Sequence, residues 1–446
     1  MQWFAQFFAR RRRIIAAVGA SCMLTTAGQA FANPSLTVDV DTGQVLQQDQ
    51  ATAAWYPASL TKLMTTYVAL KAVRQGRLTI DTPLVMSAYA ARMPASKMGF
   101  RPGTQVTLDN ALKMLMVKSP NDVAVMIAEG ISGSVENFAD DMNASARELG
   151  LHESHFVNPN GLHDSRHYSS ARDMAMIGRA LLRDFPDRAD LYSIGALKLG
   201  RIIMRNHNGL IGRYPGADGM KTGFTCPAGF NVVASASQSG RRLIVVVLGE
   251  PSAKERSIHA AALFDRGFRQ WGGAQGTLEA LSSSGDAAPP DERQEICRHR
   301  SPAAIAELED ENYAAPIPVM SGRGMASVSV VHSVGMSTGE RAAAMTAPVE
   351  FDPIPVFIGP KPGYSGPILA ARSANRPQKE AGDAAAAYAP SREADPKAVV
   401  GVGDAPLVLN AVVKPSKAGN GKQKPLVATK DKPKRRPKKT EEKTTN

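Results

Sequence analysis

The chain carries Ser59-Leu60-Thr61-Lys62 at the start of a segment, reaching Val73, in which apolar residues recur at helical spacing. A helix over these residues places Ser59 at its beginning and Lys62 one turn later on the same side. A serine hydroxyl is a poor nucleophile near neutral pH and needs a base within hydrogen-bond reach. The stretch therefore predicts a serine nucleophile at a helix start, with a lysine beside it as the base.

Two further motifs follow in order, Ser119-Pro120-Asn121 and Lys221-Thr222-Gly223. The first precedes an apolar run and is typical of a helix start with Ser119 as the N-cap and proline in the first turn. An isolated S-x-x-K tetrapeptide is expected roughly once or twice by chance in a chain this long. The order and spacing of the three motifs therefore carry the functional information.

Two hairpins are expected around these motifs. Leu36–Val40 and Gln44–Leu46 are separated by a turn signal, and so are the apolar runs Phe230–Ser237 and Leu243–Leu248. Lys221 lies just before the second hairpin, so we expect the third motif on a strand with two antiparallel partners. Residues 34–272 are enough chain for one core, or for a core with a helical subdomain.

The ordered triple of motifs is the signature of penicillin-interacting serine acyl-transferases. The surrounding residues resemble the low-molecular-mass D-alanyl-D-alanine carboxypeptidases, from about Pro34 to about Gly272. This resemblance implies an α/β (α+β) fold of the serine β-lactamase/DD-peptidase type, with an antiparallel sheet flanked by helices and an all-helical subdomain. The segments that carry it are Tyr56–Thr65, Asn158–His163, Tyr168–Ala175 and Asp218–Thr225.

The resemblance implies a catalytic set of Ser59, Lys62, Ser119 and Asn121. Lys62 can act as the base only if burial or a nearby positive charge lowers its pKa, and Lys221 can supply that charge. Ser119 would relay a proton to the leaving group. Asn121 would form a hydrogen bond with the substrate amide.

The resemblance also implies how substrate is held. The oxyanion donors would be the backbone N–H groups of Ser59 and Phe224, the first of them at a helix N-terminus. Thr222, Thr225 and Arg256 are candidates for holding a terminal carboxylate together with Lys221. The full substrate-binding set expected is Lys221, Thr222, Gly223, Phe224, Thr225 and Arg256.

The implied activity removes the terminal D-alanine from peptidoglycan stem pentapeptides through an acyl-enzyme on Ser59, which β-lactam antibiotics would also acylate. A D,D-endopeptidase would use the same site. A serine β-lactamase fits less well, because Glu153–Asn158 resembles the E-x-x-L-N loop of those enzymes only with the wrong spacing. The non-enzymatic alternative is an inert scaffold that binds the cell wall through its tail.

No cofactor and no metal are expected. His152, Glu153 and His155 do not have a standard metal-ligand spacing. Of the three cysteines, Cys22 leaves with the predicted leader, and we expect Cys226 and Cys297 to be free thiols because Cys297 lies in an irregular segment. A single disulfide in an oxidising compartment is the alternative.

The two ends of the chain differ from residues 33–275, the expected catalytic domain. Residues 1–32 combine a basic block, an apolar stretch and Ala30-Phe31-Ala32, which predicts a cleaved secretory signal peptide and export to the periplasm or cell envelope. A signal anchor is the alternative, but the apolar stretch is short for a membrane span.

Residues 276–446 are rich in Ala, Pro, Ser, Gly and charge, so we expect a long, mostly disordered tail. No second all-β domain and no amphipathic anchoring helix is evident in its sequence. The formal net charge of the whole chain is +12, and a dense basic run spans Lys430–Lys439. In an exported protein such a run would bind an anionic membrane surface or a cell-wall polymer rather than nucleic acid.

Overall fold

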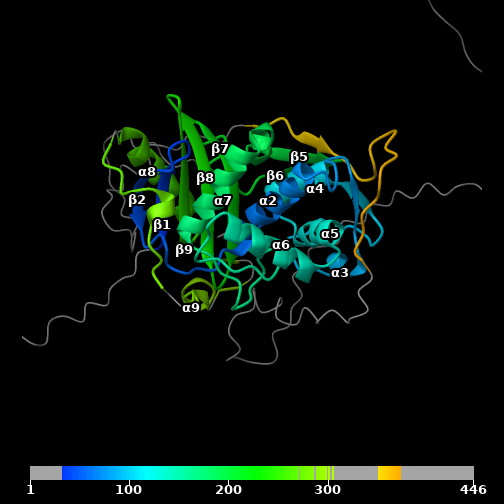
Figure 1. Ribbon diagram of the computed structural model, residues 1–446, viewed down its shortest axis with the longest axis horizontal. Helices are drawn as coiled ribbons and strands as arrows, with labels where there is room; N and C mark the ends of the chain where they lie inside the picture. The colour runs from blue at the N-terminus through cyan, green and yellow to red at the C-terminus, as the bar shows by residue number, and fades with distance from the viewer. Residues whose placement is uncertain are drawn as a thin grey trace, which may run out of the picture. The chain divides into compact units, whose positions relative to one another are not determined.

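A five-stranded antiparallel sheet is the largest sheet of the computed structural model (Figure 1), which describes residues 33–270, 272–285, 288–298, 300–301, 304–305 and 350–372. These residues belong to the first of the chain's two units, Met1–Ala405; the second, Pro406–Asn446, lies outside them, as does the predicted signal peptide. The strand order is β2-β1-β9-β8-β7. The strands are β1 (Ser35–Asp39), β2 (Val45–Asp49), β7 (Ala217–Thr225), β8 (Gly229–Gln238) and β9 (Arg241–Glu250).

Helices cover both faces of this sheet, which explains why β9 is apolar at every position from Leu243 to Leu248. Successive side chains of a strand point to opposite faces. Ile244 and Val246 join the core on the side of α7 (Ala171–Asp184). Val245 and Val247 join a second core under α8 (Ala253–Arg269). Both expected hairpins, β1 with β2 and β8 with β9, are confirmed.

A helical subdomain lies beyond the β7 edge of the sheet (Figure 1). Thr107 and Ser134 cap two of its helices, each accepting a hydrogen bond from a backbone N–H in the first turn. Another helix, α5, is buried from its first residue to Ile131, so it forms the middle of the subdomain. The helices are α2 (Thr61–Arg74), α3 (Ala88–Ala91), α4 (Leu108–Val117), α5 (Asn121–Ser132) and α6 (Val135–Glu148).

Short elements complete the described part of the chain. Five short strands form two small sheets, with strand orders β3-β4 and β10-β5-β6. The bounds are β3 (Pro83–Val85), β4 (Gln105–Thr107), β5 (Ala196–Leu199), β6 (Ile202–Arg205), β10 (Ile354–Val356), α9 (Arg293–Ile296) and the 3-10 turns η1 (Ala58–Leu60), η2 (Pro186–Tyr192) and η3 (Leu278–Ala280).

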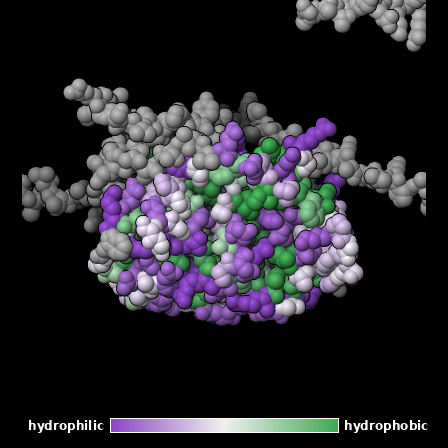
Figure 2. Space-filling view, turned by 90° about the horizontal axis from the view of Figure 1, so that it is seen from above, coloured by the Kyte–Doolittle hydropathy of each residue, from purple (hydrophilic) through white to green (hydrophobic). Residues whose placement is uncertain are grey.

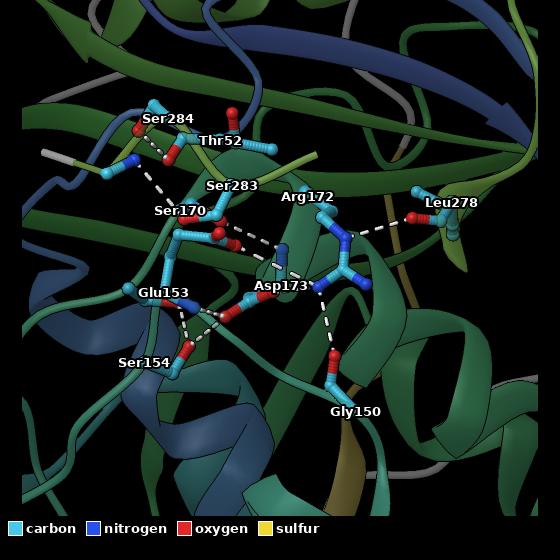
Figure 3. A network of polar contacts seen from close by, with 12 residues as sticks. Thr52, Gly150, Glu153, Ser154, Ser170, Arg172, Asp173, Leu278, Ser283 and Ser284 are labelled. Atoms are coloured by element: carbon cyan, nitrogen blue, oxygen red, sulfur yellow. Dashed lines mark hydrogen bonds and ion pairs between the residues drawn. The ribbon is translucent and has the colours of Figure 1, made fainter. Parts of the chain in front are cut away.

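The first described residues beyond position 275 are packed, not disordered. Thr277 forms a β-bridge with Gln44, and Leu278 is fully buried. The carbonyl of Leu278 accepts a hydrogen bond from the buried Arg172, and Ser284 donates to the carbonyl of Thr52 (Figure 3). Residues beyond the expected boundary at 275 therefore contact the sheet domain through Leu278 and these hydrogen bonds.

A second packed part of the predicted tail spans residues 350–372. Its strand β10 pairs in parallel with β5. Asn110 donates to the carbonyl of Phe357, and Arg372 donates its backbone N–H to the carbonyl of Gly133. The expectation of disorder is wrong for this segment, because β10 pairs with β5, Val356 is buried and backbone hydrogen bonds tie the segment to the helical subdomain. The remainder of the tail lies outside the described residues.

Hydrophilic and hydrophobic residues are interspersed over the face shown in Figure 2. The large apolar side chains that are most exposed in the described ranges belong to β6 and to residues 354–368. Scattered exposed apolar residues are usual on folded proteins. No helix within the described ranges is long and apolar enough to cross a membrane.

Candidate active site

The predicted nucleophile lies in η1, the 3-10 turn that leads directly into α2. Ala58, just before it, has a positive φ of 48°. Gly161 presses against this turn so closely that a Cβ there would lie 1.8 Å from the carbonyl oxygen of Ala58. Only glycine fits at that position, which also has a φ of 80°. The loop around Gly161 therefore helps to hold Ser59 at the start of the helix.

Lys62 lies beside Ser59, as its position one turn into the helix predicts. Its Nζ is 2.8 Å from Ser59 Oγ and 2.9 Å from Asn121 Oδ1, and it also donates to the carbonyl of Asn160 at 2.7 Å. The side chain is fully buried. Burial first, and then the charge of Lys221, lower the pKa of Lys62 well below 10.5. The short distance to Ser59 Oγ and the lowered pKa of Lys62 together suit its amine to accept a proton from Ser59.

Asn121 is held from two sides. Its Oδ1 accepts from Lys62, and its Nδ2 donates to the carbonyls of Pro94 and Ala95 at 3.2 and 3.0 Å. The next residue, Asp122, is fully buried and accepts from the backbone N–H groups of Met98 and Gly99. Its carboxylate therefore fixes the loop whose carbonyls orient the Asn121 amide.

Ser119 does not cap α5. The N-cap residue is Pro120, and no side chain makes a capping hydrogen bond. Ser119 instead has a φ of 59°, and its hydroxyl is buried without a hydrogen-bond partner in the described residues. The capping interpretation is wrong, because the left-handed backbone at Ser119 ends the helical path before α5 begins. An unpaired buried hydroxyl costs about 1–3 kcal/mol, so it is expected where function requires it.

The third motif runs along β7, against the nucleophile turn. A Cβ on Gly223 would lie 2.9 Å from the backbone nitrogen of Ser59, so the strand approaches the turn more closely than a larger residue permits. Lys221 is buried and donates to the carbonyl of Thr222 at 2.7 Å. Burial, and then the charge of Arg256, lower the pKa of Lys221 to about 7. Phe224 continues the same strand, so the two predicted oxyanion donors belong to segments in contact.

The remaining predicted binding residues are buried around the same strand. Thr222 and Thr225 are buried on β7. Arg256, on α8, is also buried; its Nη1 lies 3.4 Å from the carbonyl of Asn231, in a strand that pairs with β7. The charge of Arg256 lowers the pKa of Lys221.

Cys226 and Cys297 form a disulfide, with an S–S distance of 2.01 Å. The expectation of two free thiols is wrong. Cys297 follows the short helix α9, which packs on the turn after β7 and brings the two Cα atoms to 5.7 Å. That separation suits a disulfide. The irregular composition of the segment around Cys297 gave no signal of this packing.

Glu153 belongs to a buried network far along the chain from the three motifs (Figure 3). Its backbone N–H donates to Asp173, and its carboxylate lies 3.8 Å from Nη1 of Arg172. His155 is occupied with the carbonyl of Arg166. Among the described residues, no three side chains of His, Cys, Asp or Glu gather as a metal site requires. Glu153 thus lies in one polar cluster with Arg172 and Asp173.

The carbonyl of Asn160 and the carboxylate of Asp122 are site features that the motifs alone did not identify. Asn160 lies in Asn158–His163, a segment recognised from the sequence without an assigned role. Asp122 follows the second motif directly but is not part of it. A backbone acceptor has no side-chain signature, so Asn160 could be found only from the fold.

The chain matches the family model for D-alanyl-D-alanine carboxypeptidase, peptidase S11, over residues 22–252, which is more than half of its length. It belongs to this family. Family members with similar sequences include D-alanyl-D-alanine carboxypeptidase DacA of Haemophilus influenzae, 40% identical over 54% of this chain and 63% of the relative. DacF of Bacillus subtilis is 36% identical over the same shares. The chain thus spans just under two thirds of the length of these curated relatives.

A solved structure of the same kind also resembles the chain. Penicillin-binding protein 5 from Haemophilus influenzae is 39% identical, with a TM-score of 0.51 over 55% of this chain and 72% of that one. The mixed fold expected from the sequence, an antiparallel sheet with flanking helices and a helical subdomain, is confirmed by the structure and by this likeness.

Proposed function

We propose that this member of the family is a serine-type D-Ala-D-Ala carboxypeptidase that removes the terminal D-alanine from peptidoglycan stem pentapeptides. The observation that carries the proposal is the hydrogen bond between Lys62 Nζ and Ser59 Oγ, 2.8 Å long, with Ser59 in η1 and Lys62 in the first turn of α2. The proposal is supported by the names of the similar carboxypeptidases, DacA and DacF.

In the proposed reaction, neutral Lys62 accepts the proton of Ser59 as Oγ attacks the penultimate peptide carbonyl. The low dielectric around the buried amine favours the neutral form that this step needs. The backbone N–H groups of Ser59 and Phe224 would stabilise the oxyanion of the tetrahedral intermediate. D-Alanine then leaves with a proton relayed through Ser119, and water hydrolyses the ester on Ser59.

The substrate carboxylate is assigned to the β7 side of the site. Lys221 and Arg256 are the cations there, and Thr222 and Thr225 supply hydroxyl groups from the same strand. Charge-assisted hydrogen bonds of this kind are stronger than neutral ones. A free carboxyl terminus on the leaving D-alanine would therefore be favoured over an amide.

Fluorescent penicillin provides the test, because a β-lactam acylates the nucleophile of such a site. We expect the protein to be labelled and to release D-alanine from a stem pentapeptide, and we expect Ser59→Ala to abolish both. Labelling of the alanine variant at the wild-type rate would overturn the assignment. A folded protein that shows neither reaction would instead favour the inert scaffold.

Two enzymatic alternatives are separated by products. A D,D-endopeptidase would cleave a cross-linked dimer faster than a pentapeptide. A β-lactamase would hydrolyse the penicillin many times per active site, but Glu153, the residue nearest to the required sequence pattern, is bound into the network of Arg172 and Asp173. This placement argues against a water-activating role for Glu153.

The location of the protein and the partner of its basic tail are also part of the proposal. We propose that residues 1–32 direct export to the periplasm or cell envelope, where peptidoglycan and β-lactams are met. The basic tail would bind an anionic membrane surface or cell-wall polymer there. Neither a cofactor nor a metal is required by the proposed steps.

A further inference from the structure

The disulfide attaches an additional piece of chain to the strand that carries the third motif. Cys226 follows the last residue of β7 and is three residues after Gly223. Cys297 ends α9, whereas the match to the family model ends at residue 252. The bridge therefore links the edge of the site to a segment outside the matched region.

The α9 segment covers the turn after β7. The backbone N–H of Glu292 donates to the carbonyl of Pro227 at 3.0 Å. Ile296 packs with both cysteines and with Phe230 in one buried cluster, and Phe224 lies against this cluster. The rings of Phe224 and Phe230 are stacked, with centroids 4.1 Å apart. The side chain of the residue that supplies one predicted oxyanion donor thus rests on the cluster that contains the disulfide.

The same turn is tied to the nucleophile from its other side. Trp55 Nε1 donates to the carbonyl of Ala228 at 2.9 Å, and Asn231 Nδ2 donates to the carbonyl of Tyr56 at 2.9 Å. Ala228 and Asn231 lie at the end of the turn and just beyond it, and their partners Trp55 and Tyr56 lie just before Ser59. A shift of the turn would consequently change the relative positions of the two predicted oxyanion donors.

Resting on the acyl transfer proposed above, we propose that the Cys226–Cys297 bridge and α9 position the oxyanion side of the site, so that opening the bridge slows acylation of Ser59. The bridge acts through the backbone of Phe224, two residues before Cys226. Oxyanion donors stabilise the transition state most when they are already in position, because no free energy is then spent on moving them during the reaction.

Opening the bridge is a two-electron reduction. A dithiol reductant gives two electrons and two protons; the S–S bond breaks, two cysteine thiols form, and the reductant becomes a disulfide. Both cysteines are fully buried, so the reductant reaches them only when the α9 segment opens locally. Serine variants make the same change without any need for access.

The experiment measures the rate constant of labelling by fluorescent penicillin and the final labelled fraction, on the full chain. We compare oxidised protein, protein whose thiols are shown by mass to be reduced, Cys297→Ser, and the double variant Cys226→Ser/Cys297→Ser. We expect the rate constant to fall about tenfold in all three altered forms, less than the ~10²–10³ for complete loss of a donor. The labelled fraction should stay complete, and reductant should not slow the double variant further.

A matched control separates positioning from general destabilisation. Asp173→Asn weakens the buried network of Figure 3, which lies outside the site, and should lower the melting temperature without changing the rate constant well below it. An unchanged rate constant in the bridge variants would overturn the inference, and so would a loss confined to the labelled fraction. Failure of the proposed function is a different result, since oxidised wild-type protein would then not be labelled through Ser59.

Discussion

Lys221 acts electrostatically on Lys62: after burial, its charge is the largest cause that lowers the pKa of the Lys62 amine. The two lysines come from different parts of the fold, since Lys62 lies on α2 and Lys221 on β7. Asp122 works in the opposite direction and raises the pKa of Lys62. The protonation state of the proposed base is thus set by charges on both the second and the third motif.

Replacing Lys221 by alanine should move the pH dependence of acylation. Removal of a positive neighbour raises the pKa of Lys62, so a higher pH is needed to deprotonate it. We expect the acid limb of the penicillin acylation profile to shift to higher pH, together with a larger loss for substrates with a free carboxylate than for the matching amides. A limb that moves to lower pH would mean that Lys62 is not the titrating base.

The buried Lys221 should also make stability depend on pH. Its pKa is about 7 in the folded protein against 10.5 for the free side chain, so the unfolded chain binds more protons between these values. Stability contributed by this group therefore rises with pH from about 7 to about 10.5. We expect Lys221→Met to raise the urea midpoint of unfolding most at or below pH 7. The increase of that midpoint between about pH 7 and pH 10.5 should be smaller in the variant than in the wild type. An equal effect of the substitution at every pH in that range would contradict the assignment.

Asp122 offers a test of how the Asn121 side of the site is supported. Asp122→Asn removes an acceptor from the Met98 and Gly99 amides and removes the negative charge that raises the pKa of Lys62. The other charges that act on Asp122 and Lys62 are those of Lys97, which lowers the pKa of Asp122, and Lys221, which lowers the pKa of Lys62. We expect slower acylation and an acid limb at lower pH, opposite to Lys221→Ala.

The control for Asp122 is again Asp173→Asn, a second buried carboxylate that accepts backbone and side-chain donors. Both substitutions should lower the melting temperature, and only Asp122→Asn should move the pH profile. The same displacement in both variants would assign the effect to loss of packing rather than to the site.

The sequence predicted the sheet domain and the Ser59–Lys62 pair because both depend on short-range patterns. Two apolar runs on either side of a turn signal identified β8 and β9, and helical spacing placed Lys62 one turn after Ser59. The bridge between Cys226 and Cys297, 71 residues apart, depends on how α9 packs, which no local pattern records. Ser119 was misjudged for a similar reason: a serine before proline is typical of a cap, whereas its left-handed backbone follows from the surrounding fold.

The packed parts of the predicted tail were missed because each is too short to form a core alone. Leu278 and Val356 are buried only because α7 and β5 are already in place. The amino-acid composition of a segment indicates whether it has enough apolar residues to form a core of its own. It does not indicate whether the segment packs against another part of the fold.

Two truncations should divide the tail by function. A chain that ends after Arg372 keeps every described contact and loses the basic run Lys430–Lys439. We expect it to be acylated by penicillin at the full rate, but to bind anionic vesicles less well at low salt. Added salt should remove the binding of the full chain as well, since exposed charges are screened beyond about 8 Å near physiological ionic strength.

A chain that ends after Gly276 should behave differently. It loses the carbonyl of Leu278 that accepts from buried Arg172, and it loses the disulfide partner of Cys226. Leaving a buried guanidinium short of acceptors is strongly destabilising. We therefore expect a melting temperature well below that of the Arg372 truncation and slower acylation where the protein is still folded. Equal stability and equal acylation in the two truncations would mean that residues 277–372 neither complete the core nor support the site.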